Sequence, residues 1–313
     1  MDNRMKIIYS DDKISSFMPC VATVGIFDGV HAGHRFLVEE LKSLARERQL
    51  ESVVITFAEH PRTVLNPDFK PQILDTLTEK IAHIESTGVD TCIVLDFTTE
   101  MAKLSASDFI TDILYQKFNV KTLLVGHDHR FGHNRADGFE EYKQYGNATG
   151  MEVFQAARYK TYVDAEISSS EIRKALQTGD VTTANRLLSY SYNISGTVVE
   201  GFKVGRTIGF PTANIEPNHP NKLIPSIGVY DVRVLLNNSQ YLGMLNIGNR
   251  PTLNNGEKIS IEVHILNFNE DIYNQAITVY FLRKIRDQRK FNGIEELKEQ
   301  LQKDKNYVIE MNK

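Results

Sequence analysis

The chain has 313 residues, about the length of two domains of roughly 150 residues each. Lysine and arginine total 36 and aspartate and glutamate total 40, so the formal net charge is −4. This balance argues against a dedicated nucleic-acid binder, because such proteins carry a clustered basic surplus.

The cysteines and the lengths of the apolar segments exclude further classes of protein. Cys20 and Cys92 lie far apart, which excludes a disulfide framework or a thiolate zinc site, and we expect both to be buried. No apolar stretch follows the first charged residues, and the longest apolar runs fall well short of a membrane span. We therefore expect a cytoplasmic protein with no membrane partner.

The first part of the chain alternates short apolar runs with helical segments. Strands are predicted at 21–27, 52–57, 91–97 and 122–125. Helices are predicted at 34–48, where Leu37 and Leu41 share a face, and at 107–118. Apolar strands separated by helices indicate a parallel sheet covered on both faces. We predict an α/β, Rossmann-like nucleotide-binding domain over residues 1–188.

After residue 188 the pattern becomes rich in strands. They are predicted at 194–200, 229–236, 241–247, 259–266 and 276–282. The range 237–240 is typical of a tight hairpin turn, and helical periodicity returns at 294–301. With 189–193 as the linker, we predict a small antiparallel β-barrel and a C-terminal helix over 189–313.

A glycine-rich turn follows the first strand, and residues 23–34 read T-V-G-I-F-D-G-V-H-A-G-H. Glycine lets the backbone approach a ligand, and the following helix start favours an anion. His31 and His34 can donate hydrogen bonds to phosphate oxygens and to charge that develops during group transfer. One alternative is that one histidine packs in the core and the other faces solvent. Another is that the two histidines bind a metal. The neighbouring Gly29 and Gly33 favour a phosphate site over both.

This turn resembles the H-x-G-H signature of the nucleotidylyltransferase superfamily, in the F-D-G-V-H-x-G-H form of prokaryotic FAD synthetases. The resemblance implies that His31 and His34 are catalytic. It further implies ATP and phosphate contacts from Gly25, Phe27, Asp28, Gly29 and Gly33. Residues 56–62, T-F-A-E-H-P-R, resemble the family's second segment, with Ala58 and Glu59 replacing part of the commoner form.

Residues 125–132 read V-G-H-D-H-R-F-G, which is similar to the family's G-x-D-x-R-F-G segment. The similarity implies flavin contacts from Gly126, Asp128 and Arg130 at the end of a parallel strand, where open sheets bind ligands. The alternative is a metal cluster formed by His127, His129 and His133. The metal cluster is the weaker interpretation, because Asp128 and Arg130 lie between the histidines and no further metal ligand is evident.

Residues 167–173 read I-S-S-S-E-I-R and match the family's S-S-x-x-x-R pattern. The match implies that Ser169, Ser170 and Arg173 hold the phosphates of ATP. Hydroxyls can cap the new helix while its first N–H groups face an anion, and Arg173 adds a forked cation. Without the histidine turn, this string would only predict an ordinary helix cap.

The string at 201–214 carries glycines four residues apart and ends in P-T-A-N. It lacks the G-K-[ST] of a Walker loop. It resembles the signature of riboflavin kinases, which implies phosphate contacts from Gly205 and Gly209. The same resemblance implies that Thr212 and Asn214 ligate Mg²⁺ bridging the ATP phosphates. The alternative is a turn-rich approach to a barrel strand.

Three later segments, 228–230, 246–252 and 262–265, match the same kinase family. In the last, Glu262 corresponds to the catalytic base, which must accept a proton from a poorly nucleophilic ribityl alcohol. An isolated glutamate on a strand is otherwise an ordinary solvent-facing residue. The late segment departs from the family's R-x-E-x-x-F, because Gln288 replaces the glutamate.

The resemblance spans about residues 21–291 and implies a bifunctional riboflavin kinase and FAD synthetase. ATP and Mg²⁺ would convert riboflavin to FMN, and a second ATP would convert FMN to FAD with release of pyrophosphate; the partners are these small molecules. Three alternatives stay open. They are an FMN adenylyltransferase with an impaired kinase half, a nucleotidylyltransferase for another phosphorylated acceptor, and a non-enzymatic metal-binding protein.

Overall fold

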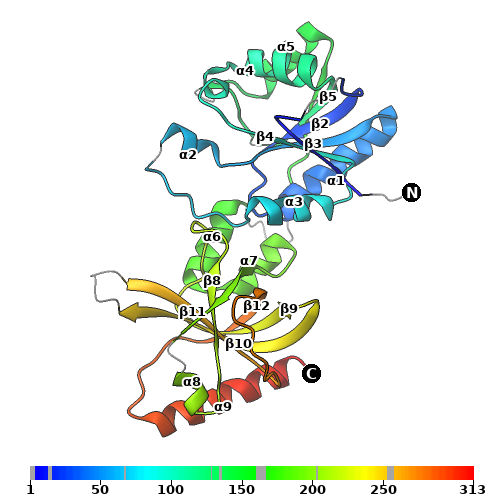
Figure 1. Ribbon diagram of the computed structural model, residues 1–313. Coiled ribbons are helices and arrows are strands. Elements are labelled where there is room, and N and C mark those ends of the chain that lie inside the picture. Colours follow the sequence, from blue (N-terminus) through cyan, green and yellow to red (C-terminus); the bar gives the residue numbers. More distant parts are fainter. Residues whose placement is uncertain are drawn as a thin grey trace. The chain divides into compact units, whose positions relative to one another are not determined.

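The computed structural model describes residues 4–12, 16–66, 68–127, 129–133, 136–159, 167–201, 204–251 and 257–313. The chain divides into two compact units, Met1–Ser168 and Ser169–Lys313. In Figure 1 the first runs from blue to green and the second from green to red. Residues 169–188 thus fall in the second unit, whereas the predicted domain boundary follows residue 188.

A six-stranded sheet forms the first unit. Its strands are β1 (Lys6–Tyr9), β2 (Cys20–Val24), β3 (Glu51–Phe57), β4 (Thr91–Leu95), β5 (Val120–Val125) and β6 (Glu152–Gln155). Their order is β1-β4-β3-β2-β5-β6, and every neighbouring pair is parallel. Both β2 and β4 are buried along their whole length, because helices cover both faces of the sheet. The predicted parallel α/β fold is confirmed.

Seven helical segments are described in this unit. They are α1 (Ala32–Arg48), α2 (Pro61–Leu65), α3 (Leu77–Glu85), η1 (Met101–Lys103), α4 (Ala106–Asp108), η2 (Phe109–Lys117) and α5 (Phe139–Thr149). Residues of α1 and α3 pack in one apolar cluster, and residues of η2 and α5 pack in another. The predicted helix at 107–118 is a single α-turn followed by the π-helix η2.

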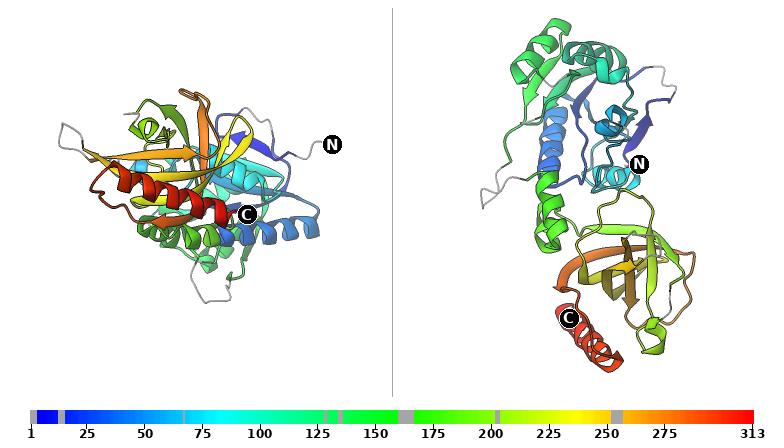
Figure 2. Two further views of the ribbon diagram at one scale, coloured as in Figure 1. Left: turned by 90° about the horizontal axis from the view of Figure 1, so that it is seen from below. Right: turned by 90° about the vertical axis from the view of Figure 1, so that its left-hand side faces the viewer.

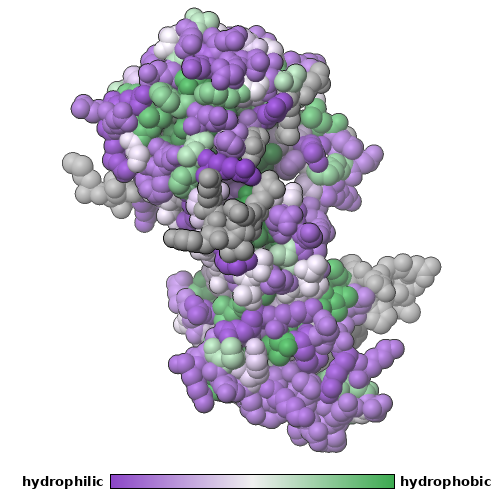
Figure 3. All heavy atoms as spheres, turned by 180° about the vertical axis from the view of Figure 1, so that it is seen from behind, coloured by the Kyte–Doolittle hydropathy of each residue, from purple (hydrophilic) through white to green (hydrophobic). Residues whose placement is uncertain are grey.

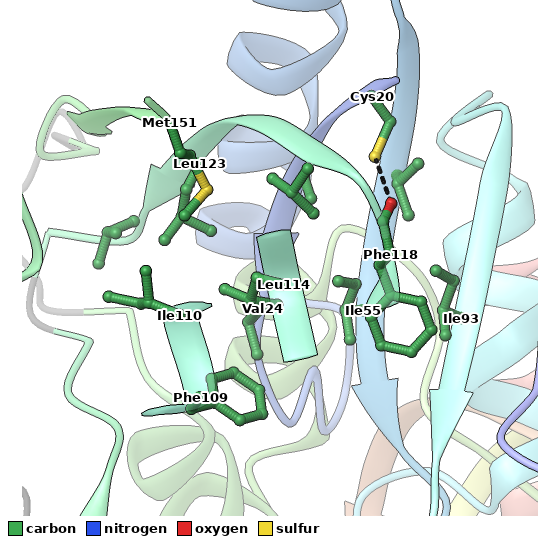
Figure 4. Close-up of a cluster of buried hydrophobic side chains, with 14 of the residues drawn as sticks. Cys20, Val24, Ile55, Ile93, Phe109, Ile110, Leu114, Phe118, Leu123 and Met151 are labelled. Atoms are coloured by element: carbon green, nitrogen blue, oxygen red, sulfur yellow. Dashed lines mark hydrogen bonds between the residues drawn. The ribbon is translucent and has the colours of Figure 1, made fainter. Parts of the chain in front are cut away.

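Figure 4 shows the second of these clusters, in which Phe109 and Leu114 of η2 lie against the strands. Cys20 is buried there, and its thiol donates to the Phe118 carbonyl at 3.7 Å. Burial raises the pKa of both cysteine thiols to about 12. Both cysteines are therefore free, buried and apolar in character, as the sequence predicts.

The second unit contains a closed antiparallel barrel of order β10-β11-β8-β7-β12-β9. Its strands are β7 (Asn193–Val199), β8 (Ala213–Pro217), β9 (Gly228–Leu236), β10 (Ser239–Pro251), β11 (Glu257–Ile265) and β12 (Ala276–Arg286). Asn237 and Asn238 both have positive φ, as a two-residue hairpin turn requires. The predicted barrel and hairpin are confirmed, and β8 is an additional strand.

Four helices are described in the second unit: α6 (Ser169–Thr178), α7 (Val181–Leu188), α8 (Val204–Thr207) and α9 (Ile294–Met311). Helix α9, red in Figure 2, packs against β10 of the barrel. The Arg286 guanidinium donates to the buried carboxylate of Asp304 in α9, with a shortest distance of 2.8 Å. The predicted C-terminal helix is therefore present and fixed to the barrel.

Hydrophilic residues predominate on the face drawn in Figure 3. Among the helices within the described ranges, none is both long and apolar enough to cross a bilayer.

Candidate functional site

The order of the strands indicates where a ligand would bind in the first unit. From β2 the chain moves to β3 and β4 on one side, whereas β5 and β6 lie on the other side. Open α/β sheets bind ligands at such a reversal, beyond the carboxyl ends of the strands. The histidine turn follows β2 and the predicted flavin segment follows β5. The two predicted motifs therefore meet at the same edge of the sheet.

The turn between β2 and α1 adopts a strained backbone. Phe27, Gly29 and Val30 have φ values of 52°, 86° and 31°, and positive φ is unfavourable for a β-branched residue such as Val30. Phe27 and Val30 are both buried in the core. Strain of this kind persists where the surroundings enforce it and clusters at functional sites.

The carboxylate of Asp28 anchors the middle of this turn. It accepts hydrogen bonds from the backbone N–H groups of Leu74 at 2.9 Å and Asp75 at 3.1 Å, and it is buried. The resemblance implies that Asp28 contacts ATP. The structure shows that its carboxylate also binds the protein backbone. Asp28 therefore helps to hold the conformation that the turn presents to a ligand.

His31 and His34 lie together at the start of α1. His31 is the N-cap, and its Nδ1 accepts from the His34 backbone N–H at 3.3 Å. Their rings stack with centroids 3.7 Å apart. A neutral His31 with Nδ1 as acceptor carries its proton on Nε2. The structure thus brings the two predicted catalytic histidines into direct contact.

Burial keeps both imidazoles neutral. It lowers the pKa of His31 to about 4, and burial together with the nearby His31 and His129 lowers the pKa of His34 well below 6.5. Near neutral pH these rings therefore offer N–H groups rather than cations. Nδ1 of His34 is buried with no hydrogen-bond partner within the described ranges, and such an atom points to a missing ligand or water.

The predicted flavin segment is only partly described, because Asp128 lies outside the described residues. Gly126 lies against Leu37 of α1, where an added Cβ would approach the Leu37 side chain at 3.7 Å, and Arg130 is exposed. Gly132 has φ of 88° and meets the backbone of Ala106 so closely that no side chain fits. These contacts hold Gly126 and Gly132 closely against neighbouring elements.

Tyr142 of α5 supports the segment that carries the predicted flavin contacts, and nothing in the sequence analysis singled it out. Its hydroxyl accepts from the Phe131 backbone N–H at 2.9 Å and lies 3.1 Å from the Asp137 carbonyl. Its ring stacks on Phe131 with centroids 4.2 Å apart, and the side chain is buried. No local spacing marks such a contact; an aromatic residue on the buried face of the next helix was the available signal.

The predicted phosphate residues at 169–173 begin helix α6. Ser169 is its first residue, Ser170 is exposed, and Arg173 is half-buried one turn later. A helix start favours an anion through its N–H groups and dipole. These residues belong to the second unit, and their role toward ATP stays a prediction.

In the barrel, the predicted kinase residues gather around Glu262 on β11. Glu262 is paired with Asn214 on β8 and with Asn246 on β10, and cross-strand partners share a face of the sheet. The Thr212 hydroxyl donates to the Glu262 carboxylate at 3.5 Å. Three oxygen-bearing side chains from two motifs thus form one group: Thr212, Asn214 and Glu262.

This oxygen-rich group suits a magnesium ion that also binds phosphate. Mg²⁺ takes oxygen ligands and needs few of them from the protein when a nucleotide supplies others. The Asn214 amide packs directly over Gly201, where any side chain would collide with it. Within the described ranges, no group of three or more His, Cys, Asp and Glu residues is placed to hold a metal by itself.

A cavity of about 550 Å³ adjoins Thr212. Val263 and Ile265 line it, so it lies on the opposite face of β11 from Glu262, because successive side chains alternate. Arg206 and Gly209 form another part of the wall, and Arg206 donates to the Tyr273 hydroxyl at 3.2 Å. Its size is typical of small-molecule sites, and Thr212 borders both this cavity and the base.

The backbone around α8 requires glycine at two of the predicted phosphate-binding positions. Gly209 has φ of 84°, and a Cβ on Gly205 would lie 2.2 Å from the Phe210 carbonyl oxygen. The loop is tightly turned around α8. Gln288, the departure from the family pattern, lies over Gly248, where an added Cβ would be 2.7 Å from its Nε2.

Comparisons with known proteins match both units. A family model described as FAD synthetase matches residues 13–171, and one described as riboflavin kinase matches residues 188–312. The bifunctional riboflavin kinase/FMN adenylyltransferase of Bacillus subtilis is 40% identical over 301 residues, covering 92% of this chain and 91% of the relative. The Escherichia coli K12 protein of the same description is 38% identical, covering 91% and 90%.

A solved structure is similar over almost the whole chain. It is described as a macrolide-efflux protein from Streptococcus pneumoniae and is 32% identical, with a TM-score of 0.88. The match covers 97% of this chain and 99% of that one.

Proposed function

The chain belongs to the bifunctional riboflavin kinase/FMN adenylyltransferase family, and from this premise we propose how its residues make FAD from riboflavin. The enzyme uses ATP twice. It first phosphorylates riboflavin to FMN, and it then joins AMP to FMN and releases pyrophosphate. The domain boundary that we propose for the two activities follows residue 188.

The barrel performs the kinase step. Glu262 accepts the proton of the ribityl hydroxyl as that oxygen attacks the γ-phosphorus of ATP, and ADP leaves. The nucleotide occupies the cavity beside Arg206, and Thr212 connects this cavity with the base on the other face of the strand. Gly205 and Gly209 place their backbone against the phosphates. Thr212 and Asn214 would hold Mg²⁺, which neutralises phosphate charge.

The parallel sheet performs the adenylyl step. A phosphate oxygen of FMN attacks the α-phosphorus of ATP, and this oxygen is already negative, so no strong base is required. The imidazole N–H groups of His31 and His34 stabilise the charge that develops on the phosphates. ATP further contacts the turn, through Gly25, Phe27, Asp28, Gly29 and Gly33.

The remaining site residues and the cellular setting complete the proposal. Ser169, Ser170 and Arg173 bind ATP phosphates, and Gly126, Asp128 and Arg130 bind the flavin. The partners are riboflavin, FMN and ATP, and the net charge of −4 supports a protein without a nucleic-acid partner. We place the enzyme in the cytoplasm.

The observation that carries the kinase assignment is the hydrogen bond between Thr212 and Glu262 beside Asn214. The test is to incubate the purified chain with riboflavin, ATP and Mg²⁺ and to separate the flavins by chromatography. FMN should appear first and FAD should follow.

A second candidate function rests on Gln288, which replaces a family glutamate near Asn246. An adenylyltransferase with an impaired kinase half would convert added FMN to FAD and leave riboflavin unchanged. The same assay started from each flavin separates the two candidates.

A further inference from the structure

A buried lysine lies beneath the histidine turn and has no part in the roles assigned above. Lys80 of α3 is 6% exposed. Its ammonium donates to the Phe57 carbonyl at 2.6 Å and to the Ile26 carbonyl at 3.4 Å. Burial lowers the pKa of this amine, while the charges of Asp28 and Asp75 act in the opposite direction. Because a buried charge is costly, its place here calls for a reason.

The two carbonyls belong to different parts of the site. Phe57 ends β3, and Ile26 lies inside the turn that leads to His31. The Thr56 hydroxyl also donates to the Ile26 carbonyl, at 3.1 Å. The Ile26 peptide is thereby held against the end of β3 by two side chains.

Helix α3 holds the same turn at a second point. Leu74 and Asp75, which precede α3, donate their N–H groups to Asp28. Thr76 and Glu79 form a capping box that fixes the start of α3 immediately afterwards. The helix and the residues before it therefore hold the turn on both sides of Phe27, whose φ is 52°.

We propose that Lys80 is a positioning residue for adenylyl transfer: by tying the Ile26 carbonyl to β3, it fixes where the turn places the imidazoles of His31 and His34. The proposal rests on the proposed function. A strained turn keeps its geometry only while its surroundings enforce it. Without the ammonium, Ile26 and Phe57 each lose a donor, and the turn relaxes.

The test compares Lys80→Met with Lys42→Met in the full chain. Lys42 also donates to a backbone carbonyl, that of Thr87, but lies away from the turn. We expect Lys80→Met to lower kcat for FMN adenylylation about a hundredfold, as small misplacements of catalytic groups do. KM for FMN and ATP should stay near the wild-type values, and riboflavin phosphorylation and the Lys42→Met variant should be unaffected.

A spectroscopic measurement separates positioning from a general loss of structure. The His31 imidazole should titrate near 4 in the wild type, because the turn buries it, and should move toward 6.5 in Lys80→Met. Circular dichroism reports whether the variant is folded. If Lys80→Met does not fold, Lys80→Arg, which keeps a donor of different shape, replaces it and should show a smaller change in the same direction.

The outcomes are distinct. The inference alone is overturned if a folded Lys80 variant has the same kcat as Lys42→Met. It is also overturned if kcat falls but the pKa of His31 stays at its wild-type value. A wild-type chain that forms no FAD from FMN overturns the proposed function and this inference with it.

Discussion

The imidazole rings of His31 and His34 stack face to face, with centroids 3.7 Å and planes 15° apart. Two protonated rings at this distance would repel each other, and burial disfavours the charged form of both. The pair therefore presents neutral N–H donors at the start of a helix, the form that the proposed role requires.

Replacing His31 tests this role. Because one preorganised donor is lost, His31→Ala should slow FMN adenylylation by about a hundredfold or more. Riboflavin phosphorylation in the same sample serves as the internal control. Steady-state rates of FAD formation from FMN and ATP measure the effect, and an unchanged rate would exclude a catalytic role for His31.

The lowered pKa of His31 predicts how stability depends on pH. Between its ordinary value of 6.5 and about 4, the unfolded chain binds a proton that the folded chain does not. The free energy of unfolding should therefore fall as the pH decreases through this window, and this group should add no further loss below it. His31→Asn keeps an N-cap acceptor without the titrating ring.

Urea unfolding at a series of pH values measures the difference. The His31→Asn curve should decline less steeply than the wild-type curve between pH 6.5 and about 4, with His34 still contributing. Parallel curves would show that His31 is not held neutral in the fold.

Glu262→Gln tests the kinase base. The amide cannot accept the ribityl proton, so the rate of FMN formation should fall about 10²- to 10⁴-fold, while conversion of FMN to FAD continues. Glu216→Gln, at an exposed position on β8, is the matched control and should leave both rates unchanged. Equal loss of both activities in folded Glu262→Gln would contradict separate sites.

Tyr142→Phe tests the support of the predicted flavin segment, residues 125–132. The change keeps the ring stacked on Phe131 but removes the hydroxyl that accepts from the Phe131 backbone N–H. Because this donor is left without its acceptor, the free energy of unfolding should fall by about 1–3 kcal/mol. KM for FMN should rise in the adenylylation assay as this segment loosens. Tyr145→Phe, whose hydroxyl has only a 3.4 Å contact with Asp137, should change neither quantity measurably.

The parts of the fold that could be predicted from sequence have a strong local pattern. The buried strands, the long helix α1 and the histidine turn each occupy a continuous stretch with its own periodicity or glycines. The short edge strands β1 and β6 were missed because four residues give little periodic signal. Strand β8 was missed because its residues read first as part of the P-T-A-N motif.

The side chains that shape the sites are harder to predict, because their partners are distant in sequence. Lys80 meets Ile26 across 54 positions, and Asp28 meets Leu74 across 46. The motif predicts that Asp28 lies near phosphate, whereas only the folded chain shows its bonds to backbone N–H groups. The pairing of Glu262 with Asn214 likewise depends on the register of β11 and β8.

The central claim is that one chain holds two separate sites for consecutive reactions, and a complementation assay tests it most directly. His31→Ala and Glu262→Gln are each incubated with riboflavin, ATP and Mg²⁺, alone and mixed, and FAD is measured by chromatography. Alone, the first should accumulate FMN and the second should leave nearly all riboflavin unconverted. Mixed, they should make FAD much faster than either alone, at a rate limited by transfer of free FMN. FAD production by either variant alone at the wild-type rate, or none from the folded mixture, would contradict the account.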